Sequence, residues 1–127
     1  MTWRWVDKSA LLLLHAESLA EHGGRAGLRD EGLLDSALAR PLNLVAYGEP
    51  DLADLAAAYA FGLAKNHPFV DSNKRAAFLG AGLFLALNGF RLRASQVDAT
   101  QAMLALAADE LSEEAFARWL RANVTPR

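Results

Sequence analysis

The stretch that decides the fold is HPFVDSNKRAAFLGAGLFLALN, residues 67–88. Its first part, residues 67–72, is polar around a proline, and proline disfavours helix at the residue before it, so a loop is predicted there. From residue 73 to residue 88 the chain is apolar on nearly every side of a helix, which is typical of a helix buried by its neighbours. We therefore predict an all-α fold, a compact bundle of about six helices around this central apolar helix.

Helical periodicity and start and stop signals predict three helices before the loop. These helices are expected at residues 8–22, 31–40 and 51–66. The second is expected to end at Pro41, because proline lacks the backbone N–H that a helix interior needs. Residues 42–50 lack strong periodicity, so we expect a small irregular or hairpin flap there, in a position to contact a substrate.

Two further helices are predicted after the central one. Ser95 and Asp98 have the spacing of a capping box that opens a helix through about Ala108, and Ser112 can cap the last helix. Residues 90–93 are expected to form a short extended link. The last few residues of the chain are expected to fray, as termini commonly do.

Composition sets the class of protein. The chain has 127 residues, of which 53% are hydrophobic and 22% charged, which is typical of one compact domain over residues 1–127. It has no cysteine, which removes disulfides and thiolate nucleophiles and fits a reducing compartment, so we expect a cytoplasmic protein. The net charge is −2, so no direct nucleic-acid partner is expected. The longest apolar run is shorter than the roughly 20 residues of a membrane span, so no membrane partner is expected either.

The loop and the start of the central helix carry the groups that phosphate chemistry needs. Transfer of a phosphoryl or nucleotidyl group needs an acceptor for the proton of the attacking hydroxyl, a divalent cation and donors around the phosphate. An imidazole changes charge near neutral pH, so His67 can be the catalytic base. Carboxylate oxygen is a ligand that Mg²⁺ prefers, so Asp71 is the predicted metal ligand.

The residues that follow are predicted to bind the phosphates of a nucleotide. The turn at Ser72 and Asn73 offers backbone N–H groups as a nest for an anion. Lys74 adds a point charge, and Arg75 adds a planar fork that can make two bonds to phosphate. Phe69 is expected to point into the core and support the loop.

Taken one at a time, these residue types usually have structural roles, as helix caps or as solvated charges. Their order and spacing together favour a functional site. His15 and His22 have no partners at metal-ligand spacing, so we expect both to be structural or exposed and outside the site. Arg25, Arg29 and Arg40 are secondary candidates, because a glycine-rich loop could present an arginine to phosphate.

The motif resembles that of the Fic/Doc family, whose Fic branch reads His-Pro-Phe-x-Asp/Glu-Gly-Asn-Gly-Arg-x-x-Arg. This chain has Ser72 at the first glycine of that pattern, Lys74 at the second glycine and Phe78 at the second arginine. The last two departures are similar to the Doc branch. The resemblance extends to the segments around residues 23–41 and 88–90, and covers about residues 8–122.

The resemblance implies a Fic fold and a Doc-like toxin kinase that uses ATP and Mg²⁺. Such a kinase transfers the γ-phosphate to a hydroxyl of a translation protein, elongation factor Tu by analogy, and blocks protein synthesis. In this role His67 is the base, Asp71 the magnesium-linked carboxylate, and residues 73–75 the phosphate-binding set. The chain lacks the inhibitory motif Ser/Thr-x-x-x-Glu-Gly/Asn of many Fic proteins, so a cognate antitoxin is expected to supply an inhibitory helix in trans.

Three alternatives remain open at the level of sequence. The same motif performs AMP transfer in Fic enzymes, although Lys74 and Phe78 favour phosphoryl transfer. The chain could instead be a non-catalytic protein that only binds an antitoxin, which an intact His67 disfavours. A metal-dependent phosphohydrolase is a third reading, but His67 and Asp71 are too few ligands for a two-metal site.

Overall fold

The computed structural model describes residues 2–127, and this part of the chain folds into six helices and two short strands. The helices are α1 (Lys8–His22), α2 (Glu31–Tyr47), α3 (Leu52–Asn66), α4 (Asn73–Leu87), α5 (Gln96–Ala107) and α6 (Glu113–Asn123). The strands are β1 (Phe90–Leu92) and β2 (Val124–Pro126). The predicted all-α fold is confirmed, with a two-stranded sheet as a small addition. No helix within residues 2–127 is both long enough and apolar enough to span a bilayer.

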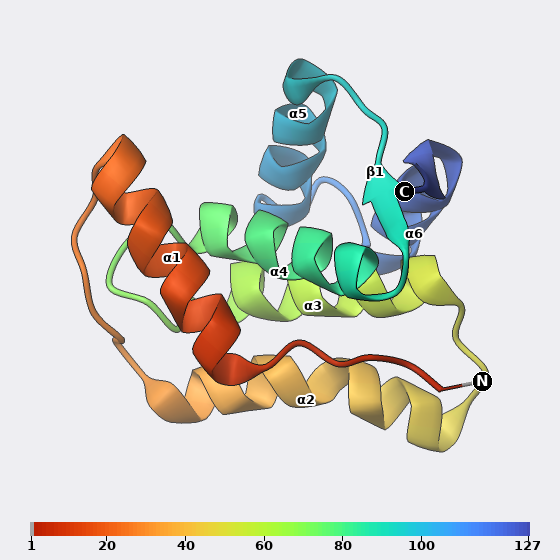
Figure 1. Ribbon diagram of the computed structural model, residues 1–127, viewed down its shortest axis with the longest axis horizontal. Coiled ribbons are helices and arrows are strands. Elements are labelled where there is room, and N and C mark those ends of the chain that lie inside the picture. Colours follow the sequence, from red (N-terminus) through yellow and green to blue (C-terminus); the bar gives the residue numbers. More distant parts are fainter. Residues whose placement is uncertain (1) are drawn as a thin grey trace.

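Helices α3 and α4 lie side by side in the middle of the molecule (Figure 1). Helix α2 packs against α3, α1 crosses α4, and α5 and α6 lie on the other side. The core draws buried side chains from all six of these helices, among them Leu11, Leu34, Leu63, Phe84, Leu106 and Phe116. The central position predicted for the apolar helix at residues 73–88 is therefore confirmed.

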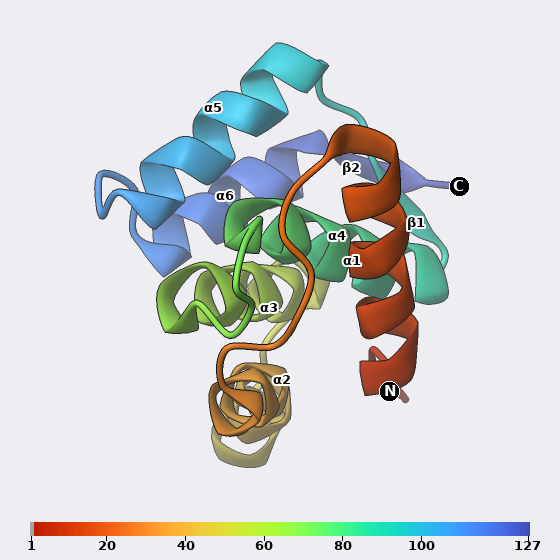
Figure 2. The ribbon, with the colours of Figure 1, turned by 90° about the vertical axis from the view of Figure 1, so that its left-hand side faces the viewer.

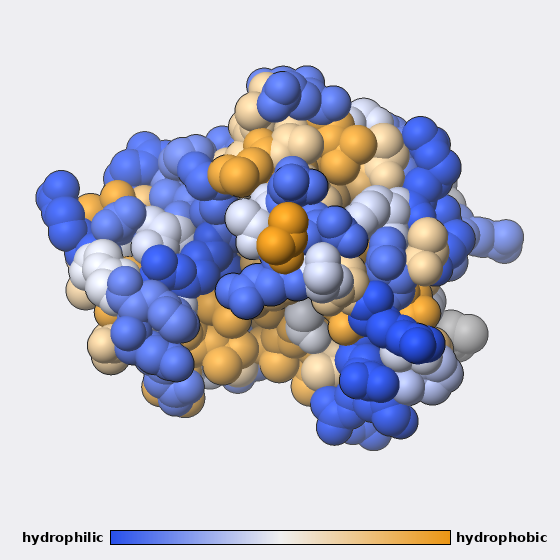
Figure 3. Space-filling model, turned by 90° about the horizontal axis from the view of Figure 1, so that it is seen from above, coloured by the Kyte–Doolittle hydropathy of each residue, from blue (hydrophilic) through white to orange (hydrophobic). Residues whose placement is uncertain are grey.

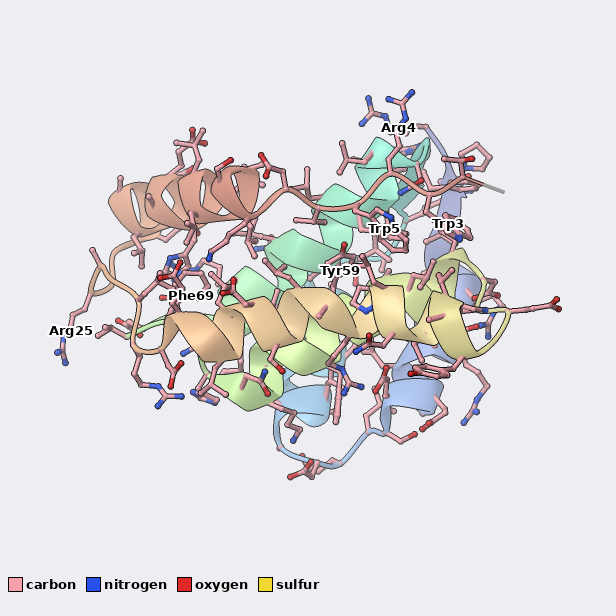
Figure 4. The ribbon with its side chains drawn as sticks, turned by 90° about the horizontal axis from the view of Figure 1, so that it is seen from below. Trp3, Arg4, Trp5, Arg25, Tyr59 and Phe69 are labelled. Atoms are coloured by element: carbon pink, nitrogen blue, oxygen red, sulfur yellow. The ribbon has the colours of Figure 1, made fainter. Side chains whose placement is uncertain are left out.

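An aromatic cluster connects the amino-terminal segment to the two central helices. Tyr59 of α3 and Phe84 of α4 are fully buried, with ring centroids 5.3 Å apart. Trp3 and Trp5 pack on Phe84 at centroid distances of 6.0 and 5.9 Å (Figure 4). The Tyr59 hydroxyl accepts a hydrogen bond from the backbone N–H of Val6 (3.1 Å), so its buried polar tip is satisfied.

The predicted flap at residues 42–50 is wrong, because α2 continues through Pro41 to Tyr47. Pro41 removes one backbone hydrogen bond, but Pro41 and Ala37 are both buried, and packing against α3 stabilises the helix. The two helices approach closely at Gly62, where an added Cβ would lie 3.1 Å from the Ala37 Cα. The apolar residues after Pro41 are mostly exposed, which is why they show no clear helical periodicity.

The carboxyl-terminal residues are ordered, so the expectation that they fray is also wrong. Strand β2 pairs with β1 in an antiparallel register that places Phe90 opposite Pro126 and Leu92 opposite Val124. The ladder supplies partners for backbone groups that would otherwise be left to solvent. Val124 also packs against the core cluster. The extended link predicted at residues 90–93 thus contains one strand of a two-stranded antiparallel sheet.

Candidate active site

The motif loop, residues 67–72, joins α3 to α4 and begins with a backbone reversal. His67 is the residue that ends α3, and it has a left-handed conformation, with φ 49° and ψ 55°. Pro68 follows and is buried. Because proline prevents the helix from continuing, the chain turns at His67 and leaves its imidazole exposed. The proposed base therefore lies at the surface, where a macromolecular substrate can reach it.

The first turn of α4 has no side-chain cap. Ser72 occupies the position before the helix in a left-handed conformation (φ 63°, ψ 40°), and its side chain makes no capping bond. The backbone N–H groups of Asn73, Lys74 and Arg75 therefore have no partner within the helix. Elsewhere in residues 2–127, the N-termini of α2, α3, α5 and α6 are capped by aspartate or serine side chains, while α1, like α4, has no side-chain cap. The uncapped end of α4 thus leaves these N–H groups unused within the helix, and such groups favour an anion.

Asn73 holds the motif loop together instead of facing the solvent. The residue is buried, its Oδ1 accepts a hydrogen bond from the Phe69 N–H (2.9 Å), and its Nδ2 donates to the Phe69 carbonyl (3.0 Å). Nδ2 also lies 3.4 Å from Nδ1 of His67, which is too long a contact to fix the tautomer of the imidazole. Asn73 can therefore contribute its backbone N–H to phosphate, while its amide shapes the loop.

Asp71 is held in its charged form by the backbone. Its Oδ2 accepts from the Arg25 N–H (3.0 Å), and its Oδ1 accepts from the Ser72 N–H (2.7 Å). These two hydrogen bonds, with the one from Arg25 the larger influence, lower the pKa of the Asp71 carboxyl below its usual value. The carboxylate is ionised at neutral pH, which a ligand of a divalent cation needs.

The carboxylate of Asp71 fits the role of a magnesium ligand. Each of its oxygens is used once, so each keeps lone-pair capacity for a cation. Within residues 2–127 there is no group of three or more His, Cys, Asp or Glu side chains that could enclose a metal ion. One carboxylate is enough for Mg²⁺, which commonly takes its other ligands from nucleotide phosphates and water.

The two cations of the motif differ in their surroundings. Lys74 is exposed and makes no hydrogen bond or ion pair with any of residues 2–127, so its ammonium group is available to a ligand. Arg75 donates from Nη1 to the Gly23 carbonyl (3.1 Å), which holds it against the end of α1. Phe78 lies one helical turn after Lys74 on α4 and is 39% exposed. An aromatic ring, which offers no phosphate ligand, thus lies next to the free cation.

The glycine loop, residues 23–30, covers the motif loop. The two run alongside each other, with Leu28 and Phe69 forming an antiparallel bridge (Figure 2). Backbone hydrogen bonds connect Val70 N–H to the Gly27 carbonyl (3.0 Å) and Arg29 N–H to the Pro68 carbonyl (2.7 Å). The segment that lies beside the motif loop is therefore the glycine loop, and not residues 42–50.

Two glycines allow this close approach. Gly24 has φ 127°, and a Cβ there would lie 2.6 Å from Leu19 Cδ2 and 3.0 Å from Ser72 Oγ. Gly27 has φ 119°, which L-residues rarely adopt. By contrast, the loop at residues 48–50 lies at the other end of α3, about 22 Å away for a helix of this length. Two hollows of about 460 and 850 Å³ adjoin that loop, and neither is lined by a motif residue.

The three secondary arginines have separate places. Arg29 donates from Nε to the His67 carbonyl (2.7 Å) and from Nη2 to the Asn66 carbonyl (2.8 Å), so it closes the end of α3. Arg25 uses its backbone N–H on Asp71, while its side chain points away from the molecule (Figure 4). Arg40 lies 4.8 Å over the Phe61 ring and pairs with an acidic residue of α6, away from the motif. Arg29 therefore stabilises the backbone at the start of the motif loop.

His15 is structural, as predicted, but it contacts the motif loop, which was not predicted. It is only 3% exposed, its Nε2 lies 3.0 Å from the Asp71 carbonyl oxygen, and its ring stacks on Phe69 at a centroid distance of 3.8 Å. Burial is the main cause that lowers the pKa of His15, so the ring is neutral at pH 7. The signal in the sequence was position, since Leu11 and Leu19, each four residues away, lie on the same buried face of α1. Phe69 is buried, as predicted, and anchors the loop.

The chain is similar in sequence to known proteins. The pattern of the Fic/DOC family matches residues 5–85 of the chain. The chain is 49% identical over 85 residues to a protein named Toxin Doc from Mycolicibacterium smegmatis, covering 65% of this chain and 64% of that protein. It is 36% identical over 90 residues to Protein kinase doc of Escherichia phage P1, covering 70% of this chain and 71% of that protein. The matched parts of the chain include the motif loop and the helices on either side of it.

Proposed function

Since this chain belongs to the Fic/DOC family, we propose that it is a Doc-like toxin that acts as a protein kinase, transferring the γ-phosphate of ATP to a protein hydroxyl. The observation that carries the proposal is the placement of an exposed His67 beside the uncapped N-terminus of α4 and the charged Asp71. One relative is named a toxin and the other a protein kinase, and these names support the proposed toxin role and the proposed kinase activity.

In the proposed reaction, His67 accepts the proton of the acceptor hydroxyl while the hydroxyl oxygen attacks the γ-phosphorus of ATP. A bond forms between that oxygen and the γ-phosphorus, the bond to the β–γ bridging oxygen breaks, and ADP leaves with that electron pair. The N–H groups at the start of α4, together with Lys74 and Arg75, stabilise the charge on the phosphate oxygens. Asp71 would hold Mg²⁺, and a bound magnesium ion neutralises part of the nucleotide charge.

Two side chains favour γ-phosphoryl transfer over AMP transfer. Lys74 replaces a glycine of the Fic pattern and places a free ammonium group beside the helix N-terminus. Phe78 replaces an arginine of that pattern, so one phosphate ligand is missing. Both changes alter how a triphosphate can lie on the N–H groups at the start of α4. This supports an orientation in which the γ-phosphorus, and not the α-phosphorus, faces the acceptor hydroxyl.

The experiment that tests this proposal uses the purified chain, a cell lysate, Mg²⁺ and ATP labelled at either the γ or the α phosphorus. Label from the γ position on a protein band is expected, and label from the α position alone would instead show AMP transfer. His67→Ala should abolish the labelling. His22→Ala is the control, because His22 is also exposed, and its side chain pairs with Glu21 and not with the motif. Labelling that survives in His67→Ala would refute the assigned base.

We further propose that the acceptor is a translation protein, with elongation factor Tu as the first candidate. The support is the likeness to the Doc branch at the motif. Purified elongation factor Tu incubated with the chain and γ-labelled ATP should take up label at one hydroxyl side chain, and mass spectrometry should locate the phosphate. If the labelled lysate protein is a different one, the class of kinase stands and the target is wrong.

The proposed partner of the toxin is an antitoxin that supplies a helix in trans. Several large apolar side chains of α4 and α5 are exposed, and apolar residues show among polar ones on the face seen from above (Figure 3). On α5, Val97 and Leu104 are 65% and 49% exposed and lie seven residues apart, on one face of the helix. An amphipathic helix could cover such side chains. Expression of the chain alone should arrest growth, and co-expression of its antitoxin should restore growth. Harmless expression of the folded chain would refute the toxin role.

A further inference from the structure

His15 is a buried polar residue that the proposed transfer does not use. We propose that His15 is a positioning residue, which holds the backbone of Asp71 so that its carboxylate faces the magnesium site. This inference rests on the proposed function only in assigning Asp71 to magnesium. Its geometric part, the hold on Asp71, concerns the chain without any ligand.

The hydrogen bond from His15 acts on a single rigid unit. A carbonyl oxygen only accepts, so Nε2 of His15 must carry the proton and donate to the Asp71 carbonyl (3.0 Å). That carbonyl belongs to the same planar peptide as the Ser72 N–H, which donates to Oδ1 of Asp71 (2.7 Å). The two bonds therefore hold opposite edges of one trans peptide. If the hydrogen bond from His15 is lost, the peptide plane can rotate, and the hydrogen bond from the Ser72 N–H to Oδ1 of Asp71 is then disturbed as well.

Stacking fixes the ring that makes this bond. The planes of His15 and Phe69 are inclined by 23°, and the two residues are 3% and 2% exposed. Phe69 is itself held through its backbone by the amide of Asn73. The imidazole thus cannot turn away from Asp71 without disturbing two buried rings. Helix α1 is connected in this way to two points of the motif loop, the Phe69 ring and the Asp71 carbonyl.

The carboxylate of Asp71 is constrained from three directions. Ser72 and Arg25 direct its oxygens, while His15 sets the peptide from which the side chain projects. Removal of the His15 donor leaves two constraints on a group that must meet a small cation with strict geometry. A positioning role therefore predicts weaker magnesium binding, and not merely weaker folding.

The test compares His15→Phe, which keeps a ring for stacking but has no donor, with His15→Gln, which keeps an amide donor at a similar reach. Amide hydrogen exchange is measured in the protein without ligands. In His15→Phe, the Ser72 and Arg25 amides bonded to Asp71 should exchange about tenfold faster, as expected for loss of one hydrogen bond. His15→Gln should stay within about threefold of the wild type. His22→Phe, an exposed position on the same helix, is the control and should leave both amides unchanged.

A second measurement follows magnesium directly. The Mg²⁺ concentration that gives half-maximal ATP binding, followed by calorimetry, should rise about tenfold in His15→Phe, in line with the lost hydrogen bond. It should return close to the wild-type value in His15→Gln. The KM for the protein acceptor should stay unchanged, since His15 is buried and does not face it.

Three results would overturn the proposal. The first is wild-type exchange at the Ser72 and Arg25 amides in His15→Phe. The second is an equal rise in exchange throughout the core of α3, which would show a general structural role. The third is a His15→Gln variant as defective as His15→Phe. A wild-type chain that moves no phosphate would refute the proposed function, whereas the exchange and magnesium measurements would still decide the role of His15.

Discussion

Replacement of Ser72 by glycine is expected to stabilise the protein. Ser72 has φ 63°, a left-handed conformation that costs an L-residue about 1–2 kcal/mol and glycine almost nothing. Glycine also increases the entropy of the unfolded chain, which offsets about 0.4–1 kcal/mol of that gain. The Ser72 hydroxyl makes no hydrogen bond to any of residues 2–127, so its removal costs nothing further. The expected net gain is about 0.5–1 kcal/mol.

The assay is urea denaturation of the wild type, Ser72→Gly and Ser72→Ala. Alanine removes the hydroxyl but keeps the cost of a positive φ, so it isolates the backbone contribution. Ser72→Gly should be more stable than Ser72→Ala by about 1 kcal/mol, with the same dependence on urea, and its thermal midpoint should be higher by about 3–5 °C. A glycine variant no more stable than the alanine variant would refute the reasoning from backbone conformation.

The same substitution should leave catalysis nearly unchanged. The bond from residue 72 to Oδ1 of Asp71 comes from the backbone N–H, and glycine keeps it. The Mg²⁺ dependence and the rate of transfer should therefore stay within about twofold of the wild type, a difference of less than half a kcal/mol. A larger loss of turnover would show that the hydroxyl contacts the nucleotide.

Three further predictions concern the frame around the site. The hydrogen bonds from Arg121 lower the pKa of Asp51 to about 2 from 3.8, so this pair stabilises the fold above about pH 4 and loses its contribution as the pH falls towards 2. Because both side chains are about half exposed, we expect the pair to contribute about 1 kcal/mol to the free energy of unfolding. In Arg121→Met, the free energy of unfolding should therefore fall less steeply between about pH 4 and pH 2 than in the wild type. Gly62→Ala should cost about 1–3 kcal/mol in urea denaturation, because a Cβ there would collide with α2, whereas Gly82→Ala, which meets open space, should gain up to about 1 kcal/mol. Arg29→Met should lower the rate of phosphate transfer more than the thermal midpoint, because it releases the His67 carbonyl; a rate equal to the wild type would contradict this.

Four of the predicted helix starts depend on a capping side chain. Asp30, Asp51, Ser95 and Ser112 each accept a hydrogen bond from a backbone N–H three residues further along the chain. Such bonds are decided within one turn, so a short stretch of sequence contains all the information they need. The start of α2, α3, α5 and α6 followed from this local chemistry.

The elements that were missed depend on partners far along the chain. Helix α2 passes Pro41 because its packing against α3, with Ala37 and Pro41 both buried, outweighs one lost hydrogen bond, and periodicity within α2 cannot show this. Strand β2 exists because β1 lies beside it, and three residues have no strand signal of their own. In both places tertiary contacts decided the structure, and local propensity did not.

The candidate site shows the same division between local and distant information. The motif residues are contiguous, so their chemistry could be predicted from order and spacing, although phosphate and magnesium binding stay predictions. The residues that orient them come from far earlier in the chain: His15 precedes Asp71 by 56 positions, Arg29 precedes His67 by 38, and Arg25 precedes Asp71 by 46. No spacing rule connects such residues before the fold is known.

It follows that the motif loop is not a self-sufficient unit. Both oxygens of Asp71 and its carbonyl are held by hydrogen bonds, but only the one from Ser72 comes from within the motif. A chain that kept residues 67–75 but lost the glycine loop would retain the base and the cations, while its carboxylate would lose a donor from Arg25 that lowers its pKa. Substitutions at Gly24 should therefore weaken magnesium binding without touching a reacting group, because any Cβ there would push the glycine loop away from Leu19 and Ser72.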